Sequence, residues 1–276
     1  MTTRLSLDTL PVELLYEVQY HALSEWLPYT SQHIRRVFQV APLSVRAQYL
    51  IGKYYTTRTP ATRTRGIITL ALRYPLCTRD VLEAILRDGT CPVIPLYAPD
   101  LPQRLFRELS PRKDGPWTVR DEPLPLLHYL FNHDRIPRPN TNAHQGFALT
   151  MAVHAGFRPL ISFLLENGAD PSWKDGLAVL VAIKRKDLDL VKMLVERSGS
   201  SVVTDNPPTS QARKRKRGER EVVRSSSKRP RLEDRLKCNV EMLRIAVKEG
   251  AMDIVQYLRE EKGCVPDMKT LRIMSV

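Results

Sequence analysis

Hydrophobic residues recur along most of the chain at intervals of three and four positions, which is the spacing of an amphipathic helix. The pattern repeats most clearly in three stretches, 147–165, 177–195 and 242–259. In each stretch an alanine inside an apolar segment is followed four residues later by a turn position, and a second apolar segment comes after it. The alanines are Ala152, Ala182 and Ala246, and the turn residues are Gly156, Lys186 and Gly250. This layout predicts pairs of short helices, and therefore an all-α fold.

The distances between the three stretches indicate an internal repeat. Ala152 and Ala182 are 30 residues apart, whereas Ala182 and Ala246 are 64 apart, which fits one unit plus an insertion. After the first stretch, Gly168 is placed to end a helix and Asp170 to open a loop. We therefore predict a projecting hairpin loop between successive helix pairs.

Residues 146–176 resemble the ankyrin repeat strongly, and within them GFRPLISFLLENGADPS follows the family pattern nearly position for position. Residues 176–198 and 239–263 resemble it less closely. The family's TPLH opening corresponds here to 147–150, and its glycine between the helices is Lys186 in the middle copy. The resemblance implies two short antiparallel helices and a β-hairpin loop in each unit of about 33 residues. It also implies a solenoid in which each unit buries its apolar face on its neighbours and exposes a surface for other proteins.

Further helices are predicted upstream, so that the solenoid would extend from about residue 63 to 268. Residues 65–89 have the same order, with Ala71 ahead of an apolar stripe. Residues 123–134 are predicted to form the second helix of another unit, followed by a hairpin at 138–146.

Two other features of the repeat region bear on its surface. Prolines between 92 and 116 predict an irregular connector over 90–120, with a short helix near 101–109. Trp173 falls on a predicted hairpin loop, where its indole is a candidate anchor for a partner protein. The alternative is that Trp173 lies flat on the adjacent hairpin.

The first 55 residues have a different pattern. Pro11 is a favourable first residue of a helix that Asp8 or Thr9 would cap, and a stripe with helical spacing follows. The stripe consists of Leu14, Leu15, Val18 and Ala22. A second helix capped by Thr30 and a third helix over 42–49 are predicted to follow.

The opening LPVELLYEV at 10–18 resembles the F-box, whose LP-x-E-LL start docks on the Skp-family linker of cullin–RING ubiquitin ligases. Together with the repeats, it resembles the F-box/ankyrin proteins of fungal type, although the F-box family's usual Cys/Arg/Trp-containing helix is missing. By this resemblance the docking residues would be Leu10, Pro11, Leu14, Leu15 and Val18. The alternative is that these apolar residues belong to a capping helix packed on the first helix pair.

The chain carries 43 Lys and Arg against 30 Asp and Glu, a formal charge of +13, and the excess is concentrated in one segment. Residues 198–236 are too polar to bury a core, which predicts a disordered insertion, and two basic clusters stand inside it at 213–217 and 228–231. The clusters resemble a bipartite nuclear localisation signal, which importin-α binds, and this implies a nuclear or nucleocytoplasmic protein. The signal residues would be Arg213, Lys214, Arg215, Lys216, Arg217, Lys228, Arg229 and Arg231.

The basic clusters have two other interpretations, a solvated charge run and a nonspecific nucleic-acid arm. No aromatic residue stands between the basic ones to stack on bases, which disfavours binding of single-stranded nucleic acid.

Sequence motifs for catalysis or ligand binding are absent. No phosphate-binding loop, nucleophile elbow, zinc-protease motif or dinucleotide fingerprint occurs, and the four cysteines and six histidines lack metal-ligand spacing. We therefore expect neither an enzyme nor a metal, cofactor or small-molecule site. Four widely spaced cysteines in 276 residues predict reduced thiols inside a cell. No apolar run approaches the roughly 18–20 residues that cross a bilayer, so no membrane segment is expected.

These patterns divide the chain into four predicted parts. They are an F-box-like segment at 5–55, repeats at 63–197, the basic insertion at 198–236 and a last repeat at 237–268. The first hypothesis is an adaptor that presents a substrate protein, bound by the repeats, to an SCF-type ubiquitin ligase. The second is a nuclear scaffold or regulator of the ankyrin-repeat type, without a ubiquitin link, whose N-terminal helices cap the stack. In both hypotheses the partners are proteins, and nucleic acid is not expected.

Overall fold

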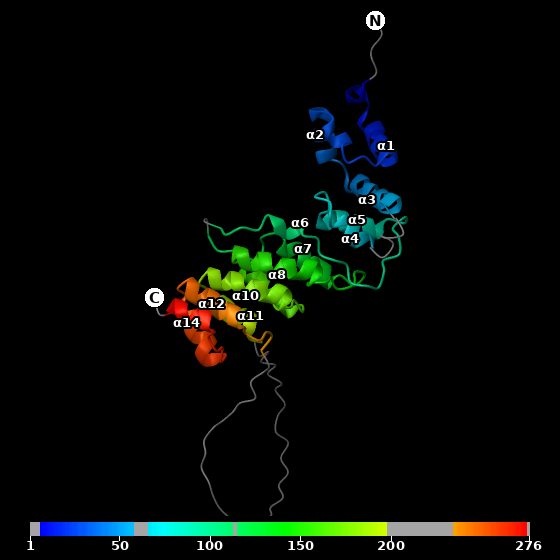
Figure 1. Cartoon of the computed structure of the whole chain (residues 1–276). Coiled ribbons are helices and arrows are strands. Elements are labelled where there is room, and N and C mark those ends of the chain that lie inside the picture. The colour runs from blue at the N-terminus through cyan, green and yellow to red at the C-terminus, as the bar shows by residue number, and fades with distance from the viewer. Residues whose placement is uncertain (1–5, 58–65, 113–114, 198–233, 275–276) are drawn as a thin grey trace, which may run out of the picture. The chain divides into compact units, whose positions relative to one another are not determined.

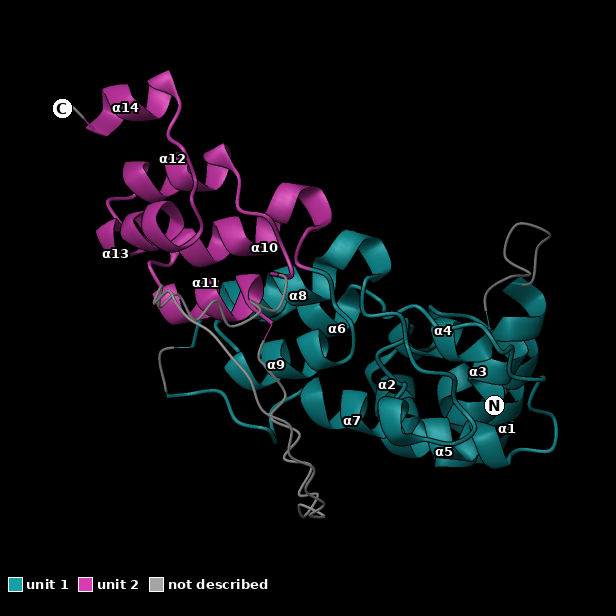
Figure 2. Cartoon of the chain, turned by 90° about the horizontal axis from the view of Figure 1, so that it is seen from below, with its two compact units in different colours: residues 1–170 teal, residues 171–276 magenta. Residues whose placement is uncertain are grey.

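The computed structural model describes residues 6–57, 66–112, 115–197 and 234–274. Helices dominate these residues and no strand occurs among them; a single parallel β-bridge joins Asp100 and Asn140. The predicted all-α class is therefore confirmed. The chain forms two compact units, residues 1–170 and 171–276, which have separate colours in Figure 2.

The helices of both units are short, and Figure 1 follows them along the chain. In the first unit they are α1 (Val12–Ala22), α2 (Gln32–Gln39), α3 (Leu43–Thr57), α4 (Ile67–Ala71), α5 (Arg79–Arg87), α6 (Arg104–Arg107), α7 (Leu124–Asn132), α8 (Ala143–Ala155) and α9 (Arg158–Glu166), with 3₁₀ turns η1 (Leu7–Thr9) and η2 (Leu27–Tyr29). In the second unit they are α10 (Trp173–Lys184), α11 (Leu188–Val195), α12 (Val240–Lys248), α13 (Met252–Gln256) and α14 (Met268–Met274), and a π-helical turn, η4 (Tyr257–Glu261), continues α13.

The first helix is not capped as the sequence predicted. α1 begins at Val12, and Pro11 occupies the N-cap position without a side-chain hydrogen bond. Both predicted caps have other partners, because they lie in the preceding turn η1. The Thr9 hydroxyl donates to a carbonyl within that turn, and Asp8 accepts a hydrogen bond from the Ser31 hydroxyl.

The cap of the second helix is also shifted, by one residue. Ser31 caps α2, and its hydroxyl oxygen accepts a hydrogen bond from the N–H of Ile34 at 3.2 Å. The predicted cap, Thr30, instead donates its hydroxyl to the carbonyl of Leu27 at 2.8 Å. Both residue types can cap a helix, so only the extended backbone at Ser31 decides between them.

The third helix is longer than predicted. α3 continues past Tyr49 to Thr57, because Leu50, Ile51 and Tyr54 carry its apolar face onward. All three of these later residues are buried, and their burial stabilises the added turns.

The predicted helix pairs are present. α8 contacts α9, α10 contacts α11 and α12 contacts α13, and these three pairs match the three repeated stretches. α4 and α5 lie within the stretch predicted at 65–89, and α7 lies within 123–134. The repeated alanines, Ala152, Ala182 and Ala246, are fully buried. A larger side chain at these positions would therefore overpack the interior.

The turn between the helices of each repeated pair has the same backbone conformation. Gly156, Lys186 and Gly250 have φ angles of 72°, 56° and 70°, which lie in the left-handed region. Glycine adopts this region without penalty, whereas an L-residue pays roughly 1 kcal/mol for it. The turn position is thus a feature of the repeat, and Lys186 is a strained copy of it.

A second left-handed feature interrupts the first turn of α8 and of α10, and it recurs after 30 residues. Residues 144–146 and residues 174–176 each have three consecutive positive φ angles, between 53° and 79°. The runs end at Gly146 and Gly176, which are 30 residues apart. These turns occupy the loops predicted as hairpins, so the loops are in the predicted places but carry no strand pairing in the described residues.

The predicted irregular connector, 90–120, is partly built into the first unit, and α6 is the short helix expected inside it. The Trp117 ring stacks on Phe157 with 4.6 Å between centroids, and its indole N–H donates to the carbonyl of Ala155 at 3.1 Å. Arg112 lies 3.9 Å from the centre of the Trp117 ring and forms an ion pair with Asp121 at 2.9 Å. The connector therefore packs on the turn between α8 and α9.

The strained turn at Lys186 gives a stability prediction. Lys186→Gly should raise the free energy of unfolding by about 0.5–1 kcal/mol, because relief of the left-handed strain exceeds the entropy that glycine gains when unfolded. Lys184→Gly, the same exchange at a right-handed position of α10, should lower it by about 0.5–1 kcal/mol. Urea denaturation of both variants provides the measurement, and a destabilised Lys186→Gly protein would contradict the prediction.

Candidate docking surface

The N-terminal helices share a small core of their own. Leu15 from α1, Leu27 from η2, and Ile34 and Val37 from α2 are buried together. Partly buried residues pack around them, namely Leu10, Tyr16, Val18 and Phe38. This core fixes the orientation of α1 and thereby decides which of its residues face outward.

A shallow apolar groove runs along the outer face of α1. Its apolar lining consists of Leu10, Leu14, Val18 and Ala22. Each is four residues from the next, so those within the helix lie on one face, and the side chain of Leu14 is 44% exposed. Glu17 and His21 complete the rim of the groove. A stripe of this kind is complementary to the apolar face of a helix from another protein.

The five predicted docking residues divide between this groove and the interior. Leu10, Leu14 and Val18 line the groove, and Pro11 is exposed beside it at the start of α1. Leu15 is fully buried in the N-terminal core. Leu15 therefore supports the surface from behind and cannot contact a partner directly.

The packing against the following helices is made largely by α3. α3 contacts both α4 and α5, and α1 contacts α3. Tyr49, Leu50, Ile51 and Tyr54 are buried along α3, and the hydroxyl of Tyr55 donates to the carbonyl of Thr90 at 3.2 Å. The groove of α1 thus remains open while α3 covers the first helix pair.

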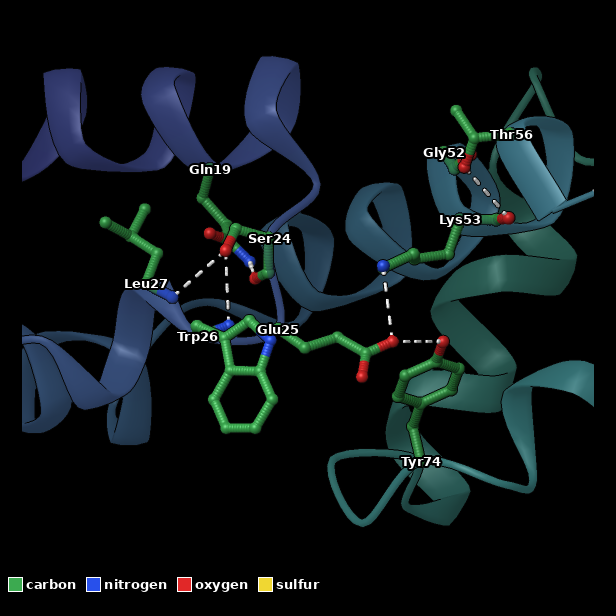
Figure 3. A network of polar contacts seen from close by, with 9 residues as sticks. All are labelled: Gln19, Ser24, Glu25, Trp26, Leu27, Gly52, Lys53, Thr56 and Tyr74. Carbon is green, nitrogen blue, oxygen red and sulfur yellow. Dashed lines mark hydrogen bonds and ion pairs between the residues drawn. The ribbon is translucent and has the colours of Figure 1, made fainter.

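The chain turns sharply between α1 and the 3₁₀ turn η2, and side-chain hydrogen bonds hold this turn (Figure 3). The amide of Gln19 donates to the carbonyl of Ser24 at 2.7 Å. The Ser24 hydroxyl oxygen accepts hydrogen bonds from the N–H groups of Trp26 and Leu27, each at 3.2 Å. These hydrogen bonds fix the backbone of the turn. They thereby also fix the C-terminal end of α1, where Ala22 lines the groove.

α1 and α3 approach each other closely at Gly52. A Cβ atom on Gly52 would lie 2.7 Å from a terminal methyl of Leu23, the residue that follows α1, so a side chain here would require that flexible methyl to move. Leu23 itself has a φ of 46°.

An ionic cluster centred on Glu25 ties the turn after α1 to the rest of the first unit (Figure 3). The Lys53 ammonium of α3 lies 3.2 Å from the Glu25 carboxylate. The hydroxyl of Tyr74, just beyond α4, donates to the same carboxylate at 3.0 Å. Because the three residues come from three different segments, the cluster positions α1 relative to α3 and α4.

The cluster shifts the titration of its members. Hydrogen bonds from Lys53 and then from Tyr74 lower the pKa of the Glu25 carboxyl. Burial, followed by the hydrogen bond to Glu25, raises the pKa of Tyr74 to about 12. Glu25 is thus a carboxylate and Tyr74 a neutral donor at neutral pH.

Two exposed aromatic residues on the turn that follows α1 were not predicted from the sequence. Trp26 is 77% exposed and Tyr29 is 69% exposed, and both belong to the turn at η2. Pro28 between them indicates a turn, and an aromatic residue on a turn is a signal that could have identified them. Exposed aromatic side chains are common anchors in protein interfaces.

The other sequence-predicted sites lie elsewhere. Trp173, predicted on a hairpin loop, stands directly ahead of the left-handed run 174–176 at the start of α10 and is 43% exposed. The basic residues of the predicted localisation signal, 213–217 and 228–231, lie outside the described residues.

Within the part of the chain that the structure describes, no group of three or more His, Cys, Asp or Glu side chains could hold a metal ion. None of the described helices combines the length and apolarity needed to traverse a bilayer.

In comparisons with known proteins, no family model, curated protein or solved structure matches the sequence. The groove on α1 and the exposed aromatic residues are therefore judged by their own geometry and chemistry.

The Glu25 cluster predicts a pH-dependent contribution to stability. A carboxyl with a lowered pKa in the folded state stabilises the fold above its unfolded pKa, and this contribution disappears as the pH falls through the folded value. Glu25→Gln should therefore cost less than about 1 kcal/mol at pH 7, since the pair is partly exposed, and should cost progressively less in acid. Chemical denaturation between pH 7 and pH 3 provides the measurement.

A matched control is Glu166→Gln at the exposed end of α9, which should change stability little at either pH. A cost for Glu25→Gln that stays constant down to pH 3 would show that the lost stability is not electrostatic.

Proposed function

We propose that this chain is a non-enzymatic adaptor of the F-box/ankyrin type, which holds a substrate protein and presents it to an SCF-type ubiquitin ligase. The observation that carries the proposal is the open apolar groove on α1. In the proposed complex a helix of the Skp-family linker protein lies against Leu10, Leu14 and Val18. Apolar side chains on one helical face offer the anchor points that such a helix needs.

The helix pairs support the second half of the proposal. Buried alanines, left-handed turns and left-handed loop runs recur 30 residues apart in the first two copies, and the alanine and the turn return 64 residues later in the third, which supports repeats of the ankyrin kind. A repeat protein of this kind binds other proteins through side chains on its exposed faces. Trp173 at the start of α10 is a candidate anchor for the substrate.

Such an adaptor needs no catalytic residue of its own. The groove would hold the ligase and the helix pairs would hold the substrate, so ubiquitin transfer would follow from high local concentration.

The second candidate is a nuclear scaffold or regulator with ankyrin repeats and no ubiquitin link. The packing of α3 on α4 and α5 favours it, because a terminal helix that covers the first pair is a capping element. In this case the N-terminal segment contributes stability and the groove binds no ligase component.

The two candidates differ in their response to charge in the groove. The double variant Leu14→Asp/Val18→Asp should bind the Skp-family linker at least tenfold more weakly than the wild type, because carboxylates would be desolvated against an apolar partner. Its melting temperature should fall by a few degrees, since Leu14 is exposed but the half-buried Val18 packs against the N-terminal core. Isothermal titration calorimetry and circular dichroism are the measurements.

Two further variants make this experiment specific. Val40→Asp places the same charge on an exposed residue at the end of α2, 80% exposed and outside the groove, and should leave binding unchanged. Leu15→Asp should unfold the N-terminal core, because it buries a charge among apolar residues. A wild-type chain that does not bind the linker would exclude the ligase adaptor and leave the scaffold.

Nuclear localisation is proposed from the two basic clusters alone. Replacing 214–217 and 228–229 with alanine should shift a fluorescent fusion of the chain from the nucleus to the cytoplasm, because importin-α requires a charge in each of its pockets. Fluorescence microscopy gives the ratio of nuclear to cytoplasmic signal. Unchanged nuclear accumulation would remove the localisation signal from the proposal.

A further inference from the structure

Two cysteines of the second unit, far apart in the sequence, meet in the fold. The side chains of Cys238 and Cys264 are close enough to interact, although 26 positions separate them in the chain, and an ion pair between Asp234 and Lys262 joins their two segments. Both are free and partly exposed. Their spacing is that of no known metal or redox motif, so only the packing of the second unit brings them together.

The backbone on both sides of Cys238 is held. The next residue, Asn239, caps α12, and its side-chain oxygen accepts a hydrogen bond from the N–H of Met242 at 2.9 Å. Three residues before Cys238, the N–H of Arg235 donates to the carbonyl of Val195 at 2.8 Å. The backbone is therefore fixed by hydrogen bonds on both sides of Cys238.

The segment that carries Cys264 is also fixed by a hydrogen bond, a turn and ion pairs. Its own N–H donates to the carbonyl of Leu258 at 2.9 Å, and Gly263 before it turns the chain with a φ of 67°. Lys262 forms ion pairs with Asp234 at 2.9 Å and with Glu196 at 3.1 Å. Through Asp234 and Lys262 the segments that carry the two cysteines are bound to each other.

The other two cysteines provide a contrast. Cys77 is buried in the first unit. Cys91 is partly exposed, but its thiol donates to the carbonyl of Pro92 at 3.5 Å. Partial exposure together with a neighbouring thiol thus distinguishes Cys238 and Cys264 from Cys77 and Cys91.

We propose that Cys238 and Cys264 are a modification site, a dithiol that peroxide closes to an intramolecular disulfide. The thiolate of one cysteine attacks a peroxide oxygen, the O–O bond breaks, and a sulfenic acid and one water form. The second thiol attacks the sulfenic sulfur, the S–O bond breaks, and a second water leaves as the S–S bond forms. Two thiols and one hydrogen peroxide thereby yield one disulfide and two waters, with two electrons passing from sulfur to oxygen.

The surroundings of the pair set the pH at which it reacts. Burial raises the pKa of Cys238 to about 12 and also raises the pKa of Cys264. Close to Cys238, Lys262 favours the thiolate and Asp234 opposes it. Both thiols are therefore protonated at neutral pH, where oxidation is slow, and the rate should rise about tenfold per pH unit because the thiolate is the nucleophile.

The test uses the full-length protein treated with hydrogen peroxide at pH 7 and pH 8. We expect the number of free thiols to fall from four to two, with a Cys238–Cys264 disulfide in the non-reduced peptide map and complete reversal by dithiothreitol. Cys91→Ser should form the same disulfide at the same rate, whereas Cys238→Ser and Cys264→Ser should not form it. Retention of four free thiols, or disulfides that involve Cys77, Cys91 or a second molecule, would overturn the proposal.

A second measurement on the wild type alone addresses the geometry. A disulfide that fits the folded structure should raise the melting temperature of the second unit by roughly 5 °C, because it restricts the unfolded chain. A lower melting temperature after oxidation would mean that the bond forms only by distorting the fold, and would overturn the assignment of the pair as a built site.

Discussion

Mutual burial of short helices is the constraint on which this structure depends. The longest helix, α3, has 15 residues and α6 has four. Isolated helices shorter than about 12–15 residues are marginal in water, so nearly every element here needs a partner that covers its apolar face. Fully buried residues such as Leu127 in α7 and Leu190 in α11 provide that cover within their own units. The exposed apolar stripe on α1 is an exception, because no partner covers it within the described residues.

The need of short helices to pack on one another also explains the connections between them. A chain that reverses direction within two or three residues needs left-handed backbone, and the turns at Gly156, Lys186 and Gly250 provide it. The left-handed runs in the first turns of α8 and α10 do the same at the other end of the helix pair. Repetition is therefore visible in the backbone angles as well as in the apolar pattern.

The helices could be predicted from the sequence because apolar periodicity is a local property. Their caps could not, since Asp8, Thr9, Thr30 and Ser31 are all competent and tertiary contacts select among them. The extent of α3 was underestimated because its later residues are stabilised by helices that follow it in the chain.

The candidate docking surface was predicted only in part. Leu14 and Leu15 are neighbours in one apolar stripe, yet about 100° separates them around the helix axis. Which of them faces outward depends on the position of α2, and sequence periodicity does not specify that position. The pairing of Cys238 with Cys264 is likewise a purely tertiary fact, because no local pattern connects them.

The hydrogen bond between Arg235 and Val195 has a consequence for how this chain tolerates change. The chain leaves the end of α11 and returns ahead of α12 at nearly the same place. The number of residues in between therefore has little effect on the packing of the helices. Loop-closure entropy grows only with the logarithm of that number, so lengthening or shortening the intervening stretch costs the framework little. Insertions and deletions can therefore accumulate at this point while the helices on either side keep their packing.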